Sequence, residues 1–283
     1  MRARSKKGAV RREKALLYAL FALIVVFFLF PVVWTLSLSL KTVPELYRLP
    51  PRLFPDTFAI QNYVYIFQHY EILRSLGNSV IITFGALAGS LLISVPAAYA
   101  FSRIKFRGAR RTQFGILMFQ MVSPLVLVVP LYKYYNALGL LNTLSGLILI
   151  YIAVSAPFQV WFLKGYLDTI PKEMDEAATI DGCNRVQAVL RIILPVMSPG
   201  LLSSILLTAI TSWSQFVVPF VLIDTTSKMP VAVKLVNLQS TLTNVTTHYL
   251  AAASIVAIFP TILLFIVLQK YIVSALTAGA IKG

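Results

Sequence analysis

Long apolar runs separated by short polar segments dominate the chain from residue 16 onward. Six of these runs reach the roughly 20 residues that a helix needs to cross a bilayer. They cover 16–40, 77–101, 112–132, 144–163, 199–223 and 250–269, and none contains Asp, Glu, Lys, Arg or His. The pattern therefore predicts an all-α membrane protein with six transmembrane helices.

Composition agrees with this pattern. Only 12% of the 283 residues are charged, and the mean hydropathy is +0.80, whereas soluble domains carry about 25% charged residues. We expect one membrane domain over 15–270, preceded by a basic N-terminus over 1–14 and followed by a tail over 271–283. The basic residues flank the apolar runs, so the net charge of +15 favours contact with membrane lipid and argues against nucleic acid as a partner.

The distribution of Lys and Arg predicts the orientation. The segments on the N-terminal side of the spans hold 18 of these residues, and the opposite loops hold 7. By the positive-inside rule, both termini face the cytoplasm. The first apolar run is too long for the core of a cleaved signal, so we interpret it as a retained anchor and first span.

Uncharged spans disfavour ion coupling, because proton- and ion-coupled transporters use ionisable groups within the membrane. The spans do carry polar side chains. We interpret six as candidates for the path of a neutral, hydroxyl-rich solute: Asn78, Gln120, Thr208, Ser212, Trp213 and Gln215. The alternative is that such groups bond to their own helix or join neighbouring helices.

Catalytic and metal-binding motifs are not found in the sequence. It has no G-x-x-x-x-G-K-[ST] phosphate loop, no H-E-x-x-H and no C-x-x-C. We therefore expect a chain that is not an enzyme, that binds no metal or cofactor of its own, and that does not hydrolyse nucleotide by itself.

A charged segment between the fourth and fifth spans, within the loop 164–198, is the most informative part of the chain. Pro171 is suited to a helix start, acids follow in the first turns, and Gly182 is suited to a left-handed stop. A second helix is expected from near Asn184 to Pro195. Met174, Ala177 and Ala178 share one face at helical spacing, and we interpret that face as a surface for a partner outside the membrane.

This segment resembles the EAA loop of ABC-transporter permeases. The shared pattern is E-A-A, three residues, Gly, nine residues, Ile, one residue, Leu-Pro. Here it is met by Glu176-Ala177-Ala178, Gly182, Ile192 and Leu194-Pro195. Asp181 before the glycine also fits the family. Three further segments resemble carbohydrate permeases: Gly139–Thr143, the element that contains Trp213, Phe216 and Pro219, and the last eight residues. In the second of these, Ser214 stands where the family usually has Asn.

The resemblance implies a type I ABC importer permease fold, of the kind of the smaller permease subunit of maltose-type sugar importers in a prokaryotic plasma membrane. It implies a second permease subunit, two cytoplasmic ATPases that hold ATP and Mg²⁺, and an extracytoplasmic sugar-binding protein as partners. The residues it implies for ATPase coupling are Glu173, Met174, Glu176, Ala177, Ala178, Asp181, Gly182 and Pro195. The tail residues it implies for ATPase contact are Gly279, Lys282 and Gly283.

Three other functions stay open at this stage. One is a permease for another neutral solute, such as a polyol or a glycerol phosphate derivative. A second is an ion-coupled secondary transporter or channel, and a third is a membrane scaffold that docks a cytoplasmic partner. The sugar itself is not identified by the sequence.

Overall fold

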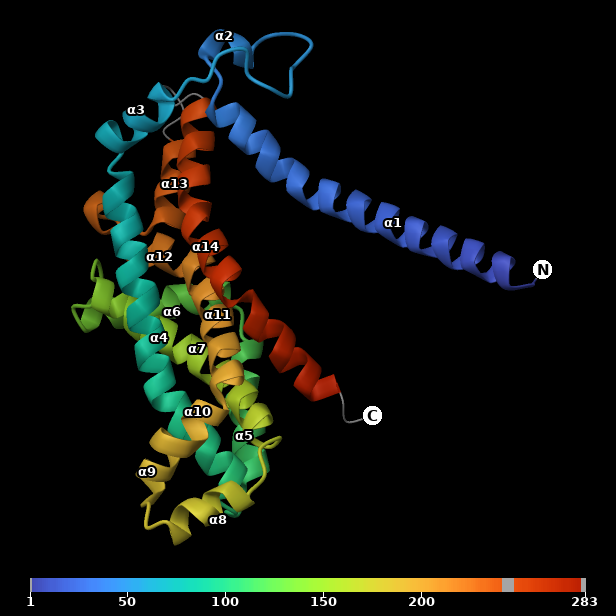
Figure 1. Ribbon diagram of the computed structural model, residues 1–283. Coiled ribbons are helices and arrows are strands. Elements are labelled where there is room, and N and C mark those ends of the chain that lie inside the picture. The colour runs from blue at the N-terminus through green and yellow to red at the C-terminus, as the bar shows by residue number, and fades with distance from the viewer. Residues whose placement is uncertain (1, 241–246, 281–283) are drawn as a thin grey trace. The chain divides into compact units, whose positions relative to one another are not determined.

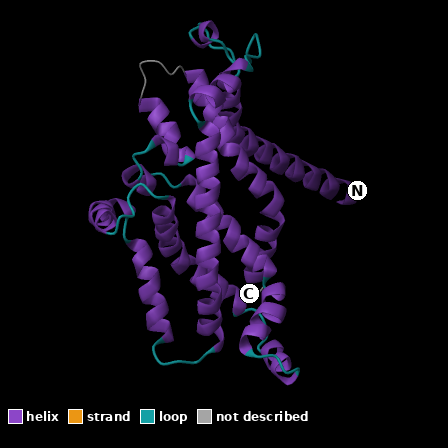
Figure 2. Ribbon diagram, turned by 90° about the vertical axis from the view of Figure 1, so that its left-hand side faces the viewer, coloured by secondary structure: helices purple, strands orange, loops and turns teal. Residues whose placement is uncertain are grey.

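The computed structural model describes residues 2–240 and 247–280, and every regular element in these ranges is a helix (Figure 2). The chain forms two compact units. Unit 1 comprises residues 1–70 and 238–257, and unit 2 comprises 71–237 and 258–283. The expected all-α fold class is confirmed.

Four helices are long and apolar enough to cross a membrane. They are α1 (Arg2–Ser39), α4 (Ile72–Arg103), α7 (Leu144–Leu167) and α14 (Thr247–Ala280), with candidate spans at 13–39, 72–103, 144–167 and 247–270 (Figure 1). These correspond to the first, second, fourth and sixth expected spans. Because α7 continues to Leu167, the loop expected from 164 begins at Asp168.

The third and fifth expected spans are broken. Residues 109–121 and 125–137 form a pair bent by 94°, made of α5 (Ala109–Met118), the 3₁₀ turn η1 (Phe119–Met121) and α6 (Pro124–Ala137). The span expected over 112–132 is therefore a bent pair of helices and not one straight helix. Ser123 is extended because it precedes Pro124, which restricts its backbone and has no N–H to continue the helix.

The fifth span consists of α11 (Ser198–Ser214), bent by 81° from residues 185–196. The expected end at 223 was wrong: Gln215 is extended, and a separate short helix, α12 (Val217–Leu222), follows. Counting each bent pair as one span gives six candidate spans among the described residues, the number that the sequence predicts.

Unit 1 contains a polar cap built around the end of α1, α2 (Val43–Leu46) and α3 (Gln61–His69). The Glu45 carboxylate accepts backbone N–H groups of Thr42, Asp56 and Thr57 at 2.8–3.1 Å, and these bonds hold its pKa below the usual value. Buried Asn62 donates to the carbonyls of Ser39 and Lys41. Side-chain amides and carboxylates therefore replace regular hydrogen bonding in this loop.

Close packing of α4 against α7 forms the centre of unit 2. Gly85 and Gly89 lie one turn apart on α4, where a Cβ would approach Ile148 and Ile152 of α7 to 2.7 and 2.2 Å. This small-xxx-small spacing lets membrane helices come close and gain van der Waals contact. Fully buried Leu163 and Leu167 of α7 continue the core toward Ile193 and Met197.

The first turns of α4 anchor the segment that follows α12. Asn78 donates to the carbonyls of Ser227 and Met229 at 3.0 and 3.2 Å, and Ser79 accepts the N–H of Val231 at 2.9 Å. These bonds fix η3 (Thr226–Lys228) and the start of α13 (Val231–Ser240). The N-terminal end of α4 is therefore tied to a loop about 150 residues away.

Asn142 joins two loops of unit 2. Its φ is +58°, and its side chain accepts the N–H groups of Asp224 and Thr225 at 3.0 and 3.1 Å and donates to the Asp224 carboxylate. The last bond is the largest cause of the lowered pKa of Asp224. Asparagine is one of the few side chains that tolerate the left-handed region, which explains its place in the Gly139–Thr143 motif.

Gly200 in α11 lies directly against the ring of Tyr166 in α7, where an added Cβ would sit 2.4 Å from Cγ. We expect Gly200→Ala to lower the free energy of unfolding by about 1–3 kcal/mol, because the ring base cannot retreat as a flexible side-chain end can. Thermal unfolding in detergent measures the change. Gly165→Ala, beside Tyr166 but with open space around the added methyl, is the matched control, and equal losses in both would contradict the packing argument.

Candidate docking segment at residues 171–199

The segment begins with α8 (Glu173–Ile180), and Lys172 is its N-cap. Pro171 therefore precedes the helix by two residues and is not its first residue as expected. The stop at Gly182 is confirmed, with φ at +83°. Cys183 N–H donates to the Ala178 carbonyl and Gly182 N–H to that of Thr179, at 3.0 and 3.1 Å. This pair of bonds is a Schellman motif, which requires a residue that adopts a positive φ.

The second helix begins where the sequence predicts. The Asn184 side chain accepts from Gln187 N–H, and Asn184 N–H donates to the Gln187 side chain, so the two form a capping box. The helix passes through α9 (Arg185–Ala188), the π turn η2 (Val189–Ile193) and α10 (Leu194–Val196). Pro195 lies inside α10 and does not end the helix as expected. The bend follows at Met197, and the π turn before the proline accommodates its missing donor.

The inner face of α8 differs from the expected docking face. Ala178 is 1% exposed, and Met174 packs against the buried cluster of Ile170, Ile193 and Met197. Two residues expected to meet a partner therefore attach α8 to its own chain. The (i, i+4) spacing of Met174 and Ala178 indicates that they share one helix face. The spacing does not indicate whether that face is buried in the chain or open to a partner.

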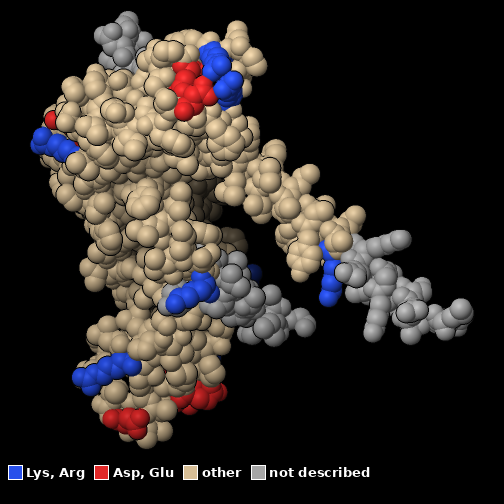
Figure 3. All heavy atoms as spheres, turned by 45° about the horizontal axis from the view of Figure 1, so that its top comes forward, with Lys and Arg blue, Asp and Glu red and all other residues tan. Residues whose placement is uncertain are grey.

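The outer face of α8 carries Glu173, Glu176, Ala177 and Ile180, all exposed, with Ile180 at 86%. Asp181 and Gly182 continue this exposed row beyond the helix end. Figure 3 shows acidic side chains at the α8 end of unit 2, with basic side chains nearby on the same face. The face available to a partner therefore carries Glu173 and Glu176 before, and Asp181 after, the apolar Ala177 and Ile180.

An ion pair ties α8 to the C-terminal end of α4, which lies beside it in Figure 1. Arg103 Nε donates to Asp175 Oδ2 at 2.8 Å, and Tyr99 donates to Asp175 Oδ1 at 2.9 Å. Arg103 also donates to the Ile170 carbonyl at 3.0 Å. The two charged side chains are only 7% and 17% exposed. The sequence analysis missed this network, although Tyr99 and Arg103 share a helix face at the (i, i+4) spacing.

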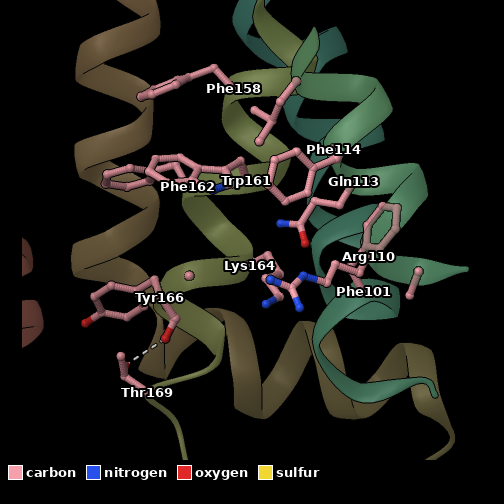
Figure 4. A pocket seen from close by; sticks show the side chains of 13 residues that line it. Phe101, Arg110, Gln113, Phe114, Phe158, Trp161, Phe162, Lys164, Tyr166 and Thr169 are labelled. Carbon is pink, nitrogen blue, oxygen red and sulfur yellow. Dashed lines mark hydrogen bonds between the residues drawn. The ribbon is translucent and has the colours of Figure 1, made fainter.

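A cavity of about 850 Å³ lies between α4, α5 and α7 (Figure 4). Aromatic side chains of Phe114, Phe158, Trp161 and Phe162 form much of its wall, while Arg110 and Lys164 extend into its polar end. Lys164 pairs with Asp168 at 2.7 Å, and Ser102 donates to the same carboxylate. The Ser102 bond holds the end of α7 against α4.

Three of the six candidate path residues, Thr208, Ser212 and Trp213, lie on α11, and the other three lie elsewhere in the chain. Asn78 is buried with its amide bonded to backbone, and Thr208 accepts from buried Gln159 at 2.8 Å. Ser212 is buried, and Trp213 lines an apolar groove that also includes Pro260. Gln215 lies at the break after α11, and Gln120 is exposed in η1. A shared path for these residues stays a prediction.

The C-terminal candidates fall at the edge of the structure. The backbone of Gly279 belongs to α14, whereas Lys282 and Gly283 lie outside the described residues. Across residues 2–240 and 247–280, no three His, Cys, Asp or Glu side chains gather closely enough to hold a metal ion.

Comparison with known sequences gives a family match over residues 81–278, described as "Binding-protein-dependent transport system inner membrane component". The trehalose/maltose transport system permease protein MalG of Thermococcus litoralis is 35% identical, over 90% of this chain and 92% of that protein. The diacetylchitobiose uptake system permease protein DasC of Streptomyces coelicolor is 32% identical, over 90% and 92%. The arabinooligosaccharides transport system permease protein AraQ of Halalkalibacterium halodurans is 33% identical, over 93% and 94%.

A solved structure shares the fold. A chain of a bacterial ABC transporter involved in the import of the acidic polysaccharide alginate superposes with a TM-score of 0.81, over 92% of this chain and 96% of that one. The sequence identity is 24%. The expected permease fold is thereby confirmed.

Proposed function

The chain belongs to the family of binding-protein-dependent transport system inner membrane components, and we propose that it is a non-catalytic permease subunit of an ATP-driven importer of di- or oligosaccharides. Relatives named for trehalose or maltose, diacetylchitobiose and arabinooligosaccharides support this substrate class. A relative named for sulfoquinovosyl glycerol, 33% identical over 90% of this chain, favours a glycerol glycoside as the second candidate.

The proposal assigns coupling to the outer face of α8. The observation that carries it is that Glu173, Glu176, Ala177 and Ile180 are exposed on a helix whose inner face is fixed by Ala178, Met174 and Asp175. A helix held in this way transmits displacement because it has few alternative positions. Coupling requires that ATP binding at the partner changes the free-energy difference between two arrangements of the transporter, and a rigid contact helix carries that change from one subunit to the other.

We infer the remaining subunits of the transporter from the likeness to this family. A second permease subunit would complete the translocation path, two cytoplasmic ATPases would bind ATP and Mg²⁺, and an extracytoplasmic binding protein would deliver the sugar. In this arrangement both termini of the chain face the cytoplasm of a prokaryote. The tail containing Gly279, Lys282 and Gly283 would then reach the ATPases.

One prediction separates the two alanines of the motif. We expect Ala178→Leu to lower the free energy of unfolding by about 1–3 kcal/mol, because its site is already filled. Ala177→Leu, on the exposed face, should leave unfolding unchanged but lower ATP-driven uptake several-fold. Thermal unfolding and uptake into vesicles measure the two effects. An Ala177→Leu variant with full uptake would place the partner elsewhere.

The test of the whole proposal begins with the chain purified from its native membrane together with the subunits that bind it. Mass spectrometry identifies those subunits, and a panel of maltose, trehalose, diacetylchitobiose and arabinotriose is offered to the reconstituted complex. We expect an ATPase subunit to co-purify and at least one sugar to stimulate ATP hydrolysis. Uptake driven by an ion gradient without ATP would refute the proposal.

A further inference from the structure

A second groove, about 700 Å³, runs along the outside of unit 2 between α4 and the helix that follows the Gly182 turn. Its walls are apolar, and many of the side chains are exposed. Leu92 and Ile104 on α4 are 77% and 41% exposed, and Val186 and Leu190 across the groove are 66% and 57% exposed. The volume lies in the range of about 300–1,000 Å³ that is typical of small-molecule sites.

The groove opens at one end into a polar pocket of about 530 Å³. Tyr99, Ile104 and Arg185 line both spaces, so the apolar and polar parts are continuous. Bulk lipid alone accounts for an exposed apolar surface on a spanning chain. It does not account for a charged pocket at the end of that surface.

The polar pocket carries an excess of positive charge. Arg103 and Asp175 neutralise each other at 2.8 Å. Three further cations, Lys105, Lys172 and Arg185, share the pocket with one further carboxylate, Glu176. Within the described part of the chain, none of these three cations belongs to an ion pair. An anion would therefore gain attraction from several directions at once.

We propose that this composite site binds one anionic phospholipid, with its acyl chains in the groove and its phosphate among Lys105, Lys172 and Arg185. Basic side chains at a membrane surface attract anionic headgroups, and the continuous apolar groove selects a lipid over a free anion. The site joins α4, α8 and α9, so the bound lipid holds the docking segment against the helix that carries it. The inference concerns lipid binding and does not depend on the transported solute.

The test uses the full chain in detergent, mixed with equal amounts of dioleoyl phosphatidylglycerol and dioleoyl phosphatidylcholine. Native mass spectrometry counts the lipids retained. We expect wild type to retain phosphatidylglycerol about tenfold over phosphatidylcholine, and the triple variant Lys105→Gln/Lys172→Gln/Arg185→Gln to lose the preference. Equal retention of both lipids by wild type would overturn the proposal.

The matched control removes the same charge from α5 and the loop before it, as Arg107→Gln/Arg110→Gln/Arg111→Gln. This control should keep the preference for phosphatidylglycerol. If the control loses the preference while the first variant keeps it, the site belongs to the cavity of Figure 4 and the assignment is overturned.

If the first triple variant unfolds, its three single variants replace it, and each should lower the retention of phosphatidylglycerol several-fold. Unchanged retention in all three contradicts the site.

Discussion

Replacing Gly182 with proline is expected to abolish ATP-driven uptake while leaving the chain inserted in the membrane. Gly182 has a φ of +83° and donates its N–H to the Thr179 carbonyl. Proline fixes φ near −65° and has no N–H, so the turn between α8 and α9 cannot form. The cost is about 3 kcal/mol or more. The exposed face of α8 then loses its position relative to the helix that follows.

Uptake into vesicles and the amount of inserted protein are the two measurements. Gly108 provides the matched control, because its φ is +90°, space around it is open, and it lies outside the docking segment. Gly108→Pro introduces comparable strain at the start of α5. If it abolishes uptake to the same degree, general strain explains the result. A well-inserted Gly182→Pro variant with normal uptake would contradict the proposed coupling role of α8.

Breaking the Asp175–Arg103 pair is expected to have the second largest effect. Asp175→Ala leaves the nearly buried Arg103 guanidinium without its partner and removes the acceptor for Tyr99. Such a change costs about 3 kcal/mol. We expect a lowered midpoint of thermal unfolding and uptake below about a tenth of wild type, because α8 is released from α4.

The control is Asp168→Ala, which removes the partner of Lys164 in a pair whose side chains are 28% and 42% exposed. An exposed pair contributes about 1 kcal/mol or less, so this variant should unfold close to wild type. The double variant Asp175→Ala/Arg103→Met should recover part of the stability, since no charge then lies unpaired. Equal midpoints for Asp175→Ala and Asp168→Ala would contradict the importance of burial.

Much of the fold could be predicted because membrane spans depend mainly on length and apolarity. The runs at 77–101 and 144–163 correspond to α4 and α7 within a few residues. The broken spans could not be located in this way. Pro124 and Pro157 lie in equally apolar runs, but the first begins α6 at a bend while the second lies inside α7. Packing against other helices decides whether a proline lies at a bend or inside a continuous helix, and hydropathy carries no information about that packing.

The local structure of the docking segment could be predicted at positions where the residue type strongly favours one backbone conformation. Gly182 at a positive φ and Asn184 as an N-cap are such cases. Which face of α8 is buried was not predictable, because Met174 and Ala178 are compatible with either a core or a partner. The role of Asp175 was hidden for a related reason: its partner Arg103 lies 72 positions away and counted only toward the orientation of the chain.

The α4 helix is bonded to other segments at both of its ends, and this has a mechanical consequence. Ser79 holds the start of α13, and Arg103 holds α8. The 24 residues between them span about 36 Å at 1.5 Å per residue, so a tilt of about 10° at one end displaces the other by about 6 Å. Pro96 lies inside this continuous helix, about two turns before Arg103. A pair of spin labels at the two ends, with Pro96→Ala for comparison, would reveal whether the rod swings as one piece or flexes at that proline.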